Sequence, residues 1–163
     1  MTTPFETLIQ RFFRRIEKDR EFFNYLNMSD EDAMSLAIER ARGLLFEAIE
    51  LINLKAIPSV DFNDYDETLQ CFNFELTNNE IMLISSFMYQ QYLERDIAKL
   101  KCLSVNYTSS NLKVFDPSNA RSTFESLYNN VCDKNEILLD EYNSKDRENN
   151  QLLSIDYSKY GDV

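Results

Sequence analysis

The sequence of 163 residues predicts a mainly α protein, a bundle of about four helices with an irregular 56–76 excursion and an extended C-terminal arm. Two observations predict this fold class. Apolar residues recur at spacings of three and four, which is the period of a helix with one buried face. These stretches also begin at residues that favour helix N-termini. We expect residues 1–142 to form the helical bundle domain and residues 143–163 to form a polar linker and an assembly arm.

The first helix is predicted to begin with Thr3 as its N-cap, Pro4 at its first position and Glu6 closing a capping box. The second helix begins after Ser29, which is followed by three acidic residues that suit the positive end of a helix. It is expected to run for about 25 residues and to be roughly 37 Å long. Its apolar arc is wider than one partner helix covers, so two neighbours must pack on it.

Residues 56–76 have no helical period, although alternation from Cys71 to Leu76 is compatible with a short strand. Thr77 and Glu80 form a second capping box and open a third helix that reaches about Leu103. A fourth helix is predicted to start at 116–117, where Asp precedes Pro, and its apolar stripe falters at 134–135. The excursion and the helices together account for the chain up to the polar linker.

The predicted arm follows a linker with no apolar residue from Asn143 to Gln151. Its apolar residues then alternate with polar ones, which is the spacing of a strand. A single strand cannot satisfy its own backbone groups, so an ordered arm must join a sheet edge or a partner. A disordered chain end is the alternative. The residues that we expect to bind a partner are Leu153, Ile155, Tyr157 and Tyr160.

The composition excludes several classes of function. The 17 basic and 28 acidic residues give a net charge of −11, which argues against general binding to duplex DNA. There is no His, which excludes His-dependent nucleophilic catalysis and His metal ligands. The only glycines, Gly43 and Gly161, are too far apart for a phosphate-binding loop. We therefore expect no enzyme, no catalytic residue and no cofactor.

The three cysteines are widely spaced and odd in number, which fits neither a disulfide framework nor a zinc site. We expect Cys71, Cys102 and Cys132 to be reduced thiols, and no metal to be bound. The first residues lack the apolar run of a signal peptide, and no stretch is long enough to span a membrane. The sequence thus predicts a protein made and folded in a reducing cytoplasm.

Two surface features are candidates for binding a partner. A basic stripe at helical spacing lies on the first helix, consisting of Arg11, Arg14, Arg15 and Lys18. It is either a solvated face that pairs with nearby acids or a docking face for an acidic partner or a nucleic-acid backbone. Phe46 points away from the apolar arc of the second helix. It is either covered by the aromatic stretch at 22–26 or placed at a subunit contact.

The acidic-capped helix starting Ser29-Asp30-Glu31-Asp32-Ala33, the segment Leu112-Lys113-Val114-Phe115-Asp116-Pro117 and the extended C-terminal arm resemble the head–tail adaptor (connector or neck) proteins of tailed bacteriophages. The resemblance implies a structural protein that forms a homo-oligomeric ring between the portal and the tail machinery. It implies that the portal protein and a tail-side neck protein are partners, and that DNA passes through the ring without specific binding or membrane contact. The expected location is the virion neck, after assembly in the host cytoplasm.

A different class of function is also open. An acidic helical regulatory protein could mimic DNA and inhibit an enzyme that binds nucleic acid. Such a mimic would be a small monomer or dimer with carboxylates spaced like phosphates, whereas an adaptor forms rings. An acidic channel suits the adaptor, because like charges keep passing DNA from sticking to its wall.

Overall fold

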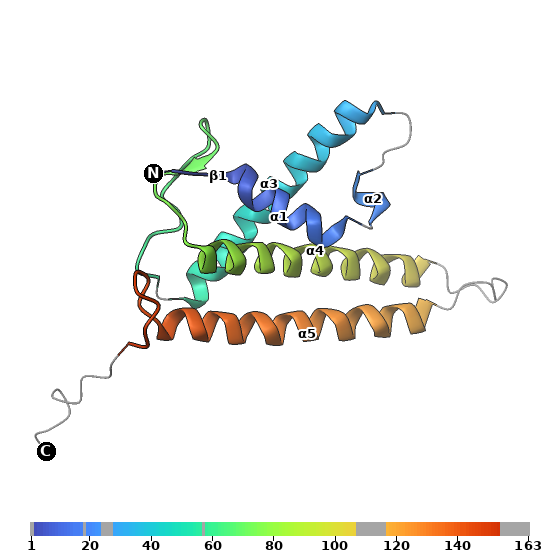
Figure 1. The fold of residues 1–163 in the computed structure, drawn as a ribbon. Helices are drawn as coiled ribbons and strands as arrows, with labels where there is room; N and C mark the ends of the chain where they lie inside the picture. Colours follow the sequence, from blue (N-terminus) through green and yellow to red (C-terminus); the bar gives the residue numbers. More distant parts are fainter. Residues whose placement is uncertain (1, 18, 24–27, 57, 107–116, 154–163) are drawn as a thin grey trace, which may run out of the picture.

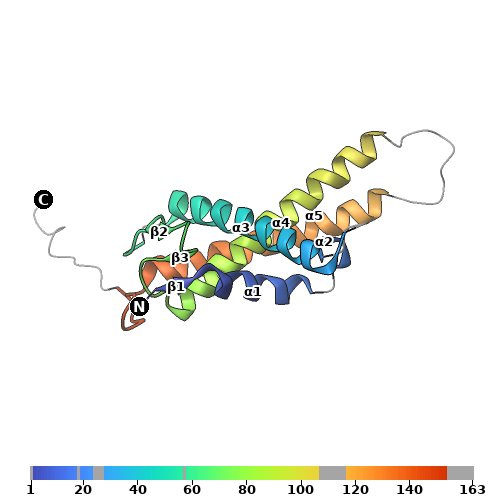
Figure 2. The same ribbon diagram turned by 90° about the horizontal axis from the view of Figure 1, so that it is seen from above.

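The computed structural model describes residues 2–17, 19–23, 28–56, 58–106 and 117–153 (Figure 1). The fold is mainly helical, as predicted. It contains the four long helices α1 (Phe5–Ile16), α3 (Asp30–Lys55), α4 (Asn78–Asn106) and α5 (Pro117–Ser144). A short helix, α2 (Arg20–Phe23), lies between the first two. Figure 1 shows α5 along one side of α4 and α1 on the other side, and Figure 2 shows α1 and α3 on opposite sides of the α4–α5 pair. The end of α3 also reaches α5, where Lys55 pairs with Glu136.

Helix α3 confirms the strongest local prediction. The Ser29 hydroxyl accepts a hydrogen bond from the Asp32 backbone N–H at 3.2 Å, and the helix runs for 26 residues. Its apolar face packs against both α1 and α4. These are the two neighbouring helices that the width of its apolar arc predicted. The capping box that opens α4 is also confirmed, with Thr77 and Glu80 exchanging hydrogen bonds of 2.7 and 3.2 Å.

The predicted cap of the first helix is wrong. Thr3 lies in strand β1 (Thr3–Pro4), and the N-cap of α1 is Pro4, which makes no side-chain capping bond. The Thr3 hydroxyl instead accepts a hydrogen bond from the Leu76 N–H at 2.8 Å. Because that donor lies far along the chain, a local motif could not reveal that the hydroxyl was already engaged.

The excursion at 56–76 forms part of a small sheet. Strands β2 (Tyr65–Asp66) and β3 (Cys71–Phe72) pair antiparallel, and β1 pairs antiparallel with the other edge of β3, so the strand order is β1-β3-β2. The strand suggested at Cys71 is thus present. The turn between β2 and β3 is held by the Asp66 carboxylate, which accepts from the N–H groups of Thr68 and Leu69.

The core is strongly aromatic where α1 meets the sheet and α4. Phe5 and Phe12 are almost fully buried, and their rings contact other aromatic rings edge-on at 5.3–5.9 Å. Phe46 stacks on Tyr65 at 5.3 Å and meets Phe5 at 5.8 Å. It is therefore covered by the sheet region. The expected cover, the stretch at 22–26, instead places Phe22 against α1 and α4.

Candidate assembly surfaces

Helix α5 is attached to α4 partly through a buried amide. Asn135 is fully buried, and its Nδ2 donates to Gln90 Oε1 at 2.8 Å and to the Ser86 backbone oxygen at 3.2 Å. The Ser86 hydroxyl donates to Asn135 Oδ1 at 2.6 Å and accepts from Arg15 Nη1 at 3.0 Å. The network links α1, α4 and α5. The sequence showed only an interruption of an apolar stripe at this position, because Ser86 and Gln90 lie on another helix.

A second polar contact joins the end of α5 to the start of α4. The carboxylate of Glu80, which is fully buried, accepts from Arg147 Nε at 2.7 Å and Nη2 at 3.1 Å, and from the Tyr142 hydroxyl at 3.2 Å. Arg147 Nη2 also donates to the Glu75 backbone oxygen at 2.6 Å. We call the Glu80, Tyr142 and Arg147 side chains the clasp.

The clasp shifts the pKa values of its members. Hydrogen bonding to Glu80 raises the pKa of Arg147 above its ordinary value, so the guanidinium stays charged. Burial, together with the adjacent Glu80 carboxylate, raises the pKa of the Tyr142 hydroxyl, which therefore stays neutral. The clasp consequently places a charged guanidinium and a neutral hydroxyl against the Glu80 carboxyl group.

The segment predicted as a polar linker is folded against the helices. Beyond α5, Asp146 N–H donates to the Gln151 oxygen at 2.8 Å, and Leu153 N–H donates to the Ser144 oxygen at 2.8 Å. These bonds close residues 144–153 into a turn that the clasp anchors to α4. The turn leaves Leu152 and Leu153 exposed by 73% and 55%. The other predicted arm residues, Ile155, Tyr157 and Tyr160, lie outside the described residues.

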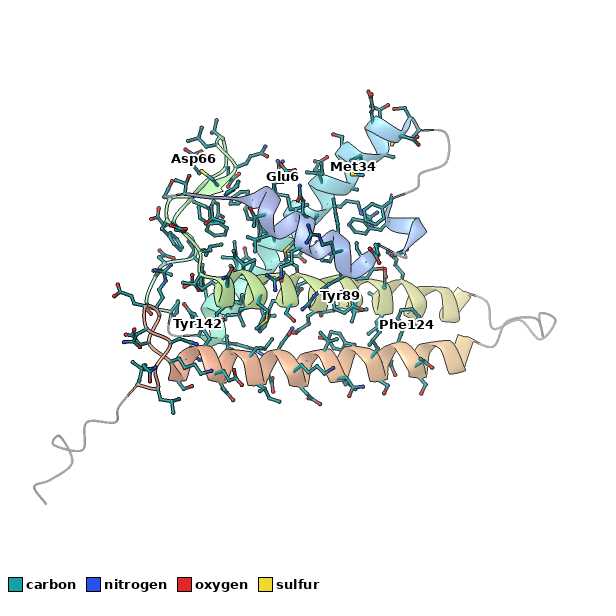
Figure 3. The ribbon with its side chains drawn as sticks, viewed as in Figure 1. Glu6, Met34, Asp66, Tyr89, Phe124 and Tyr142 are labelled. Atoms are coloured by element: carbon teal, nitrogen blue, oxygen red, sulfur yellow. The ribbon has the colours of Figure 1, made fainter. Side chains whose placement is uncertain are left out.

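A small cavity lies beside the clasp, between the start of α4 and the end of α5. Its volume is about 110 Å³, and it is lined by apolar groups such as Met82 and Leu138 and by polar groups such as Lys145 and Asn150. Figure 3 shows Tyr142 at this end of the helix pair and Phe124 near the opposite end, between α4 and α5. Phe124 is 37% exposed, so apolar surface is accessible at both ends of α5.

The basic stripe is divided by the fold. Arg11 and Arg14 are exposed on α1. Arg15 is also exposed, but its guanidinium turns toward α4, where it donates to Ser86 and lies 5.9 Å from the centre of the Tyr89 ring. Burial, with a smaller contribution from the neighbouring Arg11, lowers the pKa of Arg15 from its ordinary value. Lys18 lies outside the described residues.

Within the part of the chain that the structure describes, no cluster of Cys, Asp and Glu side chains is arranged to hold a metal ion. No helix in that part has the length and apolar character needed to cross a membrane. Of the cysteines, Cys71 and Cys132 are free and half-buried, and Cys102 lies outside the described side chains.

The described surfaces offer arginines on α1, exposed leucines after α5 and a half-exposed aromatic ring near the start of α5. No protein-family model, no curated protein and no solved structure matches the chain.

Proposed function

We propose that the chain is a structural head–tail adaptor of a tailed bacteriophage, which forms a ring between the portal and the tail machinery and continues the DNA channel. The observation that carries the proposal is the anchored turn at 144–153, at the end of the described chain. The clasp fixes this turn, and two leucines are exposed there.

The energetics of this region favour a role outside the subunit. Burying an exposed leucine contributes roughly 1.5–3 kcal/mol. Ordering each residue of an extended segment costs about 1–2 kcal/mol for its backbone alone. An arm that extends beyond the turn therefore needs hydrogen bonds in addition to apolar burial, and a neighbouring subunit or the portal protein would supply them through strand-like pairing. A turn anchored by a buried ion pair reduces the ordering cost, because the arm starts from a fixed place.

The charge of the chain also supports a channel protein. A net charge of −11 repels DNA, so a ring of such subunits lets DNA pass without binding it. In this proposal the protein has no catalytic role and requires no cofactor or metal. Its partners are further copies of itself, the portal protein and a tail-side neck protein, and its place is the neck of the virion.

The test is to delete residues 154–163, which removes the arm and keeps the turn and the clasp. We expect unchanged helix content and thermal stability but loss of the ring, measured by native mass spectrometry with and without the portal protein. A matched control replaces Ser154 and Ser158 with Ala, which keeps the arm and its apolar residues. A truncated chain that assembles as well as the full chain would contradict the proposal.

Native mass spectrometry of the full chain also distinguishes the adaptor from the alternative function, an acidic DNA mimic. An acidic DNA mimic remains a monomer or a dimer at all concentrations and is captured by an enzyme that binds nucleic acid. An adaptor gives a closed ring of defined mass. A monomeric full chain that the portal protein does not assemble would favour the mimic.

A further inference from the structure

The molecule carries opposite charges on two outward faces. Helix α1 and helix α5 lie on different sides of α4, as Figure 1 shows. Side chains along the edge of α5 away from α4 project outward in Figure 3. Each of the two helices therefore presents a long face that is not covered by α4.

The outer face of α5 is acidic with an apolar centre. Asp133, Ile137 and Asp140 are spaced four and three residues apart, so they share one side of the helix. All three are exposed, and Ile137 is exposed by 60%. This side is opposite to the one that carries the buried Asn135 and Leu139. We call these three residues the acidic face.

The outer face of α1 is basic. Arg11 and Arg14 are exposed on the side of the helix opposite to Ile9 and Ile16, which are buried in the core. Neither guanidinium forms an ion pair with a described residue. We call this pair of arginines the basic face.

We infer that the basic face of one copy of this chain docks on the acidic face of the next copy. This inference rests on the proposed function and names the subunit contact within the ring. Because the two faces carry opposite charges, a contact between α1 of one copy and α5 of the next is favoured over a contact between two identical faces. Pairing two α5 helices would place Asp133 and Asp140 opposite acidic residues, and pairing two α1 helices would place arginines opposite each other.

The resulting contact is heterologous, because each copy uses a different face toward each of its two neighbours. Such contacts build rings when the rotation between neighbours closes, and filaments when it does not. The acidic residues are about 10 Å apart along α5, and the arginines are about 5 Å apart along α1. Ile137, between the two aspartates, supplies the apolar contact that exposed ion pairs lack.

The test uses charge reversal in the full-length chain. The first variant carries Arg11→Glu and Arg14→Glu, and the second carries Asp133→Lys and Asp140→Lys. Each variant alone should lose the ring, because like charges then face each other at every contact. An equimolar mixture of the two should restore it, because alternating copies again bring opposite charges together. The matched control carries Glu39→Lys and Glu50→Lys, two exposed acidic residues of α3, and should assemble like the wild type.

A variant with all four reversals sharpens the test. It should form rings with itself but exclude the wild-type chain, measured by native mass spectrometry of isotope-labelled mixtures. At low salt the association rate of each separate variant should fall by at least about 10-fold, and this difference should shrink as salt is added. Circular dichroism of each variant checks that the fold is intact.

The outcomes separate this inference from the proposed function. Rings that persist in both charge-reversal variants would overturn the named contact and leave the adaptor proposal standing. Failure of the mixture to assemble would likewise overturn the heterologous contact. A wild-type chain that forms no ring alone or with the portal protein would overturn both.

Discussion

Helices α1 and α3 pack on α4 to form a body, and helix α5 packs on α4 separately, with more polar contacts. The body is held by fully buried apolar side chains, including Phe12, Leu45 and Phe87. Among the described residues of α5, Leu139 is the one buried apolar side chain. Leu138 and Tyr142 are partly buried against the core, and hydrogen bonds from Asn135 in the middle and from the clasp at the end add polar contacts.

The two kinds of contact contribute differently: apolar burial stabilises the fold, whereas the polar contacts fix the alignment of α5 along α4. Burial of apolar surface is non-directional, so it stabilises the body without demanding one exact alignment of helices. A buried amide can form its hydrogen bonds only in the one alignment that brings its partners within reach. Buried asparagines fix the register of coiled coils in the same way. We interpret Asn135 and the clasp as the groups that set the position of α5 along α4. The outward faces of α5 are then free for contacts with other chains.

The largest expected effect comes from cutting the aromatic core of the body. Replacing Phe12 with Ala should lower the free energy of unfolding by about 3–5 kcal/mol, through lost burial and a cavity. The matched control is Phe124→Ala on α5, where the ring is 37% exposed and the expected loss is below about 1 kcal/mol. Urea titrations monitored by circular dichroism measure both. Equal losses would mean that the two regions do not differ as described.

A smaller and more local effect is expected from the clasp. Replacing Arg147 with Ala leaves the buried Glu80 carboxylate without its cation, which should cost about 2–3 kcal/mol, since Arg147 is partly exposed. Hydrogen exchange should show faster opening of α5 and little change in α3.

The control for that variant lies in the same turn. Lys145→Ala removes an exposed pair with Glu141, which should cost below about 1 kcal/mol. If Arg147→Ala speeds hydrogen exchange equally in α3 and α5, then α5 does not open separately from the rest of the fold.

The smallest effect is a pH dependence, with one tyrosine in each region. Burial raises the pKa of Tyr92 in the body, aided by its hydrogen bond to Asp19, and raises the pKa of Tyr142 beside Glu80. The stability that each contributes is complete below the ordinary tyrosine pKa of about 10 and is lost as pH rises toward the folded-state value. This follows because only the unfolded chain releases the proton there.

Urea titrations between pH 8 and 11 test this dependence. Tyr92→Phe and Tyr142→Phe should each cost about 0.5–1.5 kcal/mol at pH 8 through a lost hydrogen bond. Above about pH 10 both variants should lose stability less steeply than the wild type, so the curves converge. Parallel curves at all pH values would contradict the raised pKa of the tyrosine concerned.

What could be predicted from the sequence was local. Ser29 and the Thr77–Glu80 pair were recognised because a cap and its partner lie within three residues. The sequence identified Glu80 as a capping residue but not as the centre of the clasp. Its cation, Arg147, is brought to it only when α5 packs along α4.

For the candidate surfaces, too, the sequence predicted which side of a helix a residue occupies but not its partners on other elements. Helical spacing correctly placed Arg11 and Arg14 on one exposed side of α1. It could not show that Arg15 has a partner on α4, since the Ser86 hydroxyl is supplied by tertiary packing. Phe46 was recognised as lying off the apolar arc, but its cover, Tyr65, belongs to a segment without periodicity.

The pairing of β1 with β3 has a consequence for the order of events during synthesis. Thr3 pairs with Phe72, and α1 packs on α4 as well as on α3, so the docking surface of the first helix is incomplete until α4 has emerged. At about 5–20 residues per second, the apolar side of α1 waits for several seconds. Charged residues that flank such a stretch act as gatekeepers against aggregation. Arg11 and Arg14 flank Phe12 and Phe13 in the positions that such gatekeepers occupy.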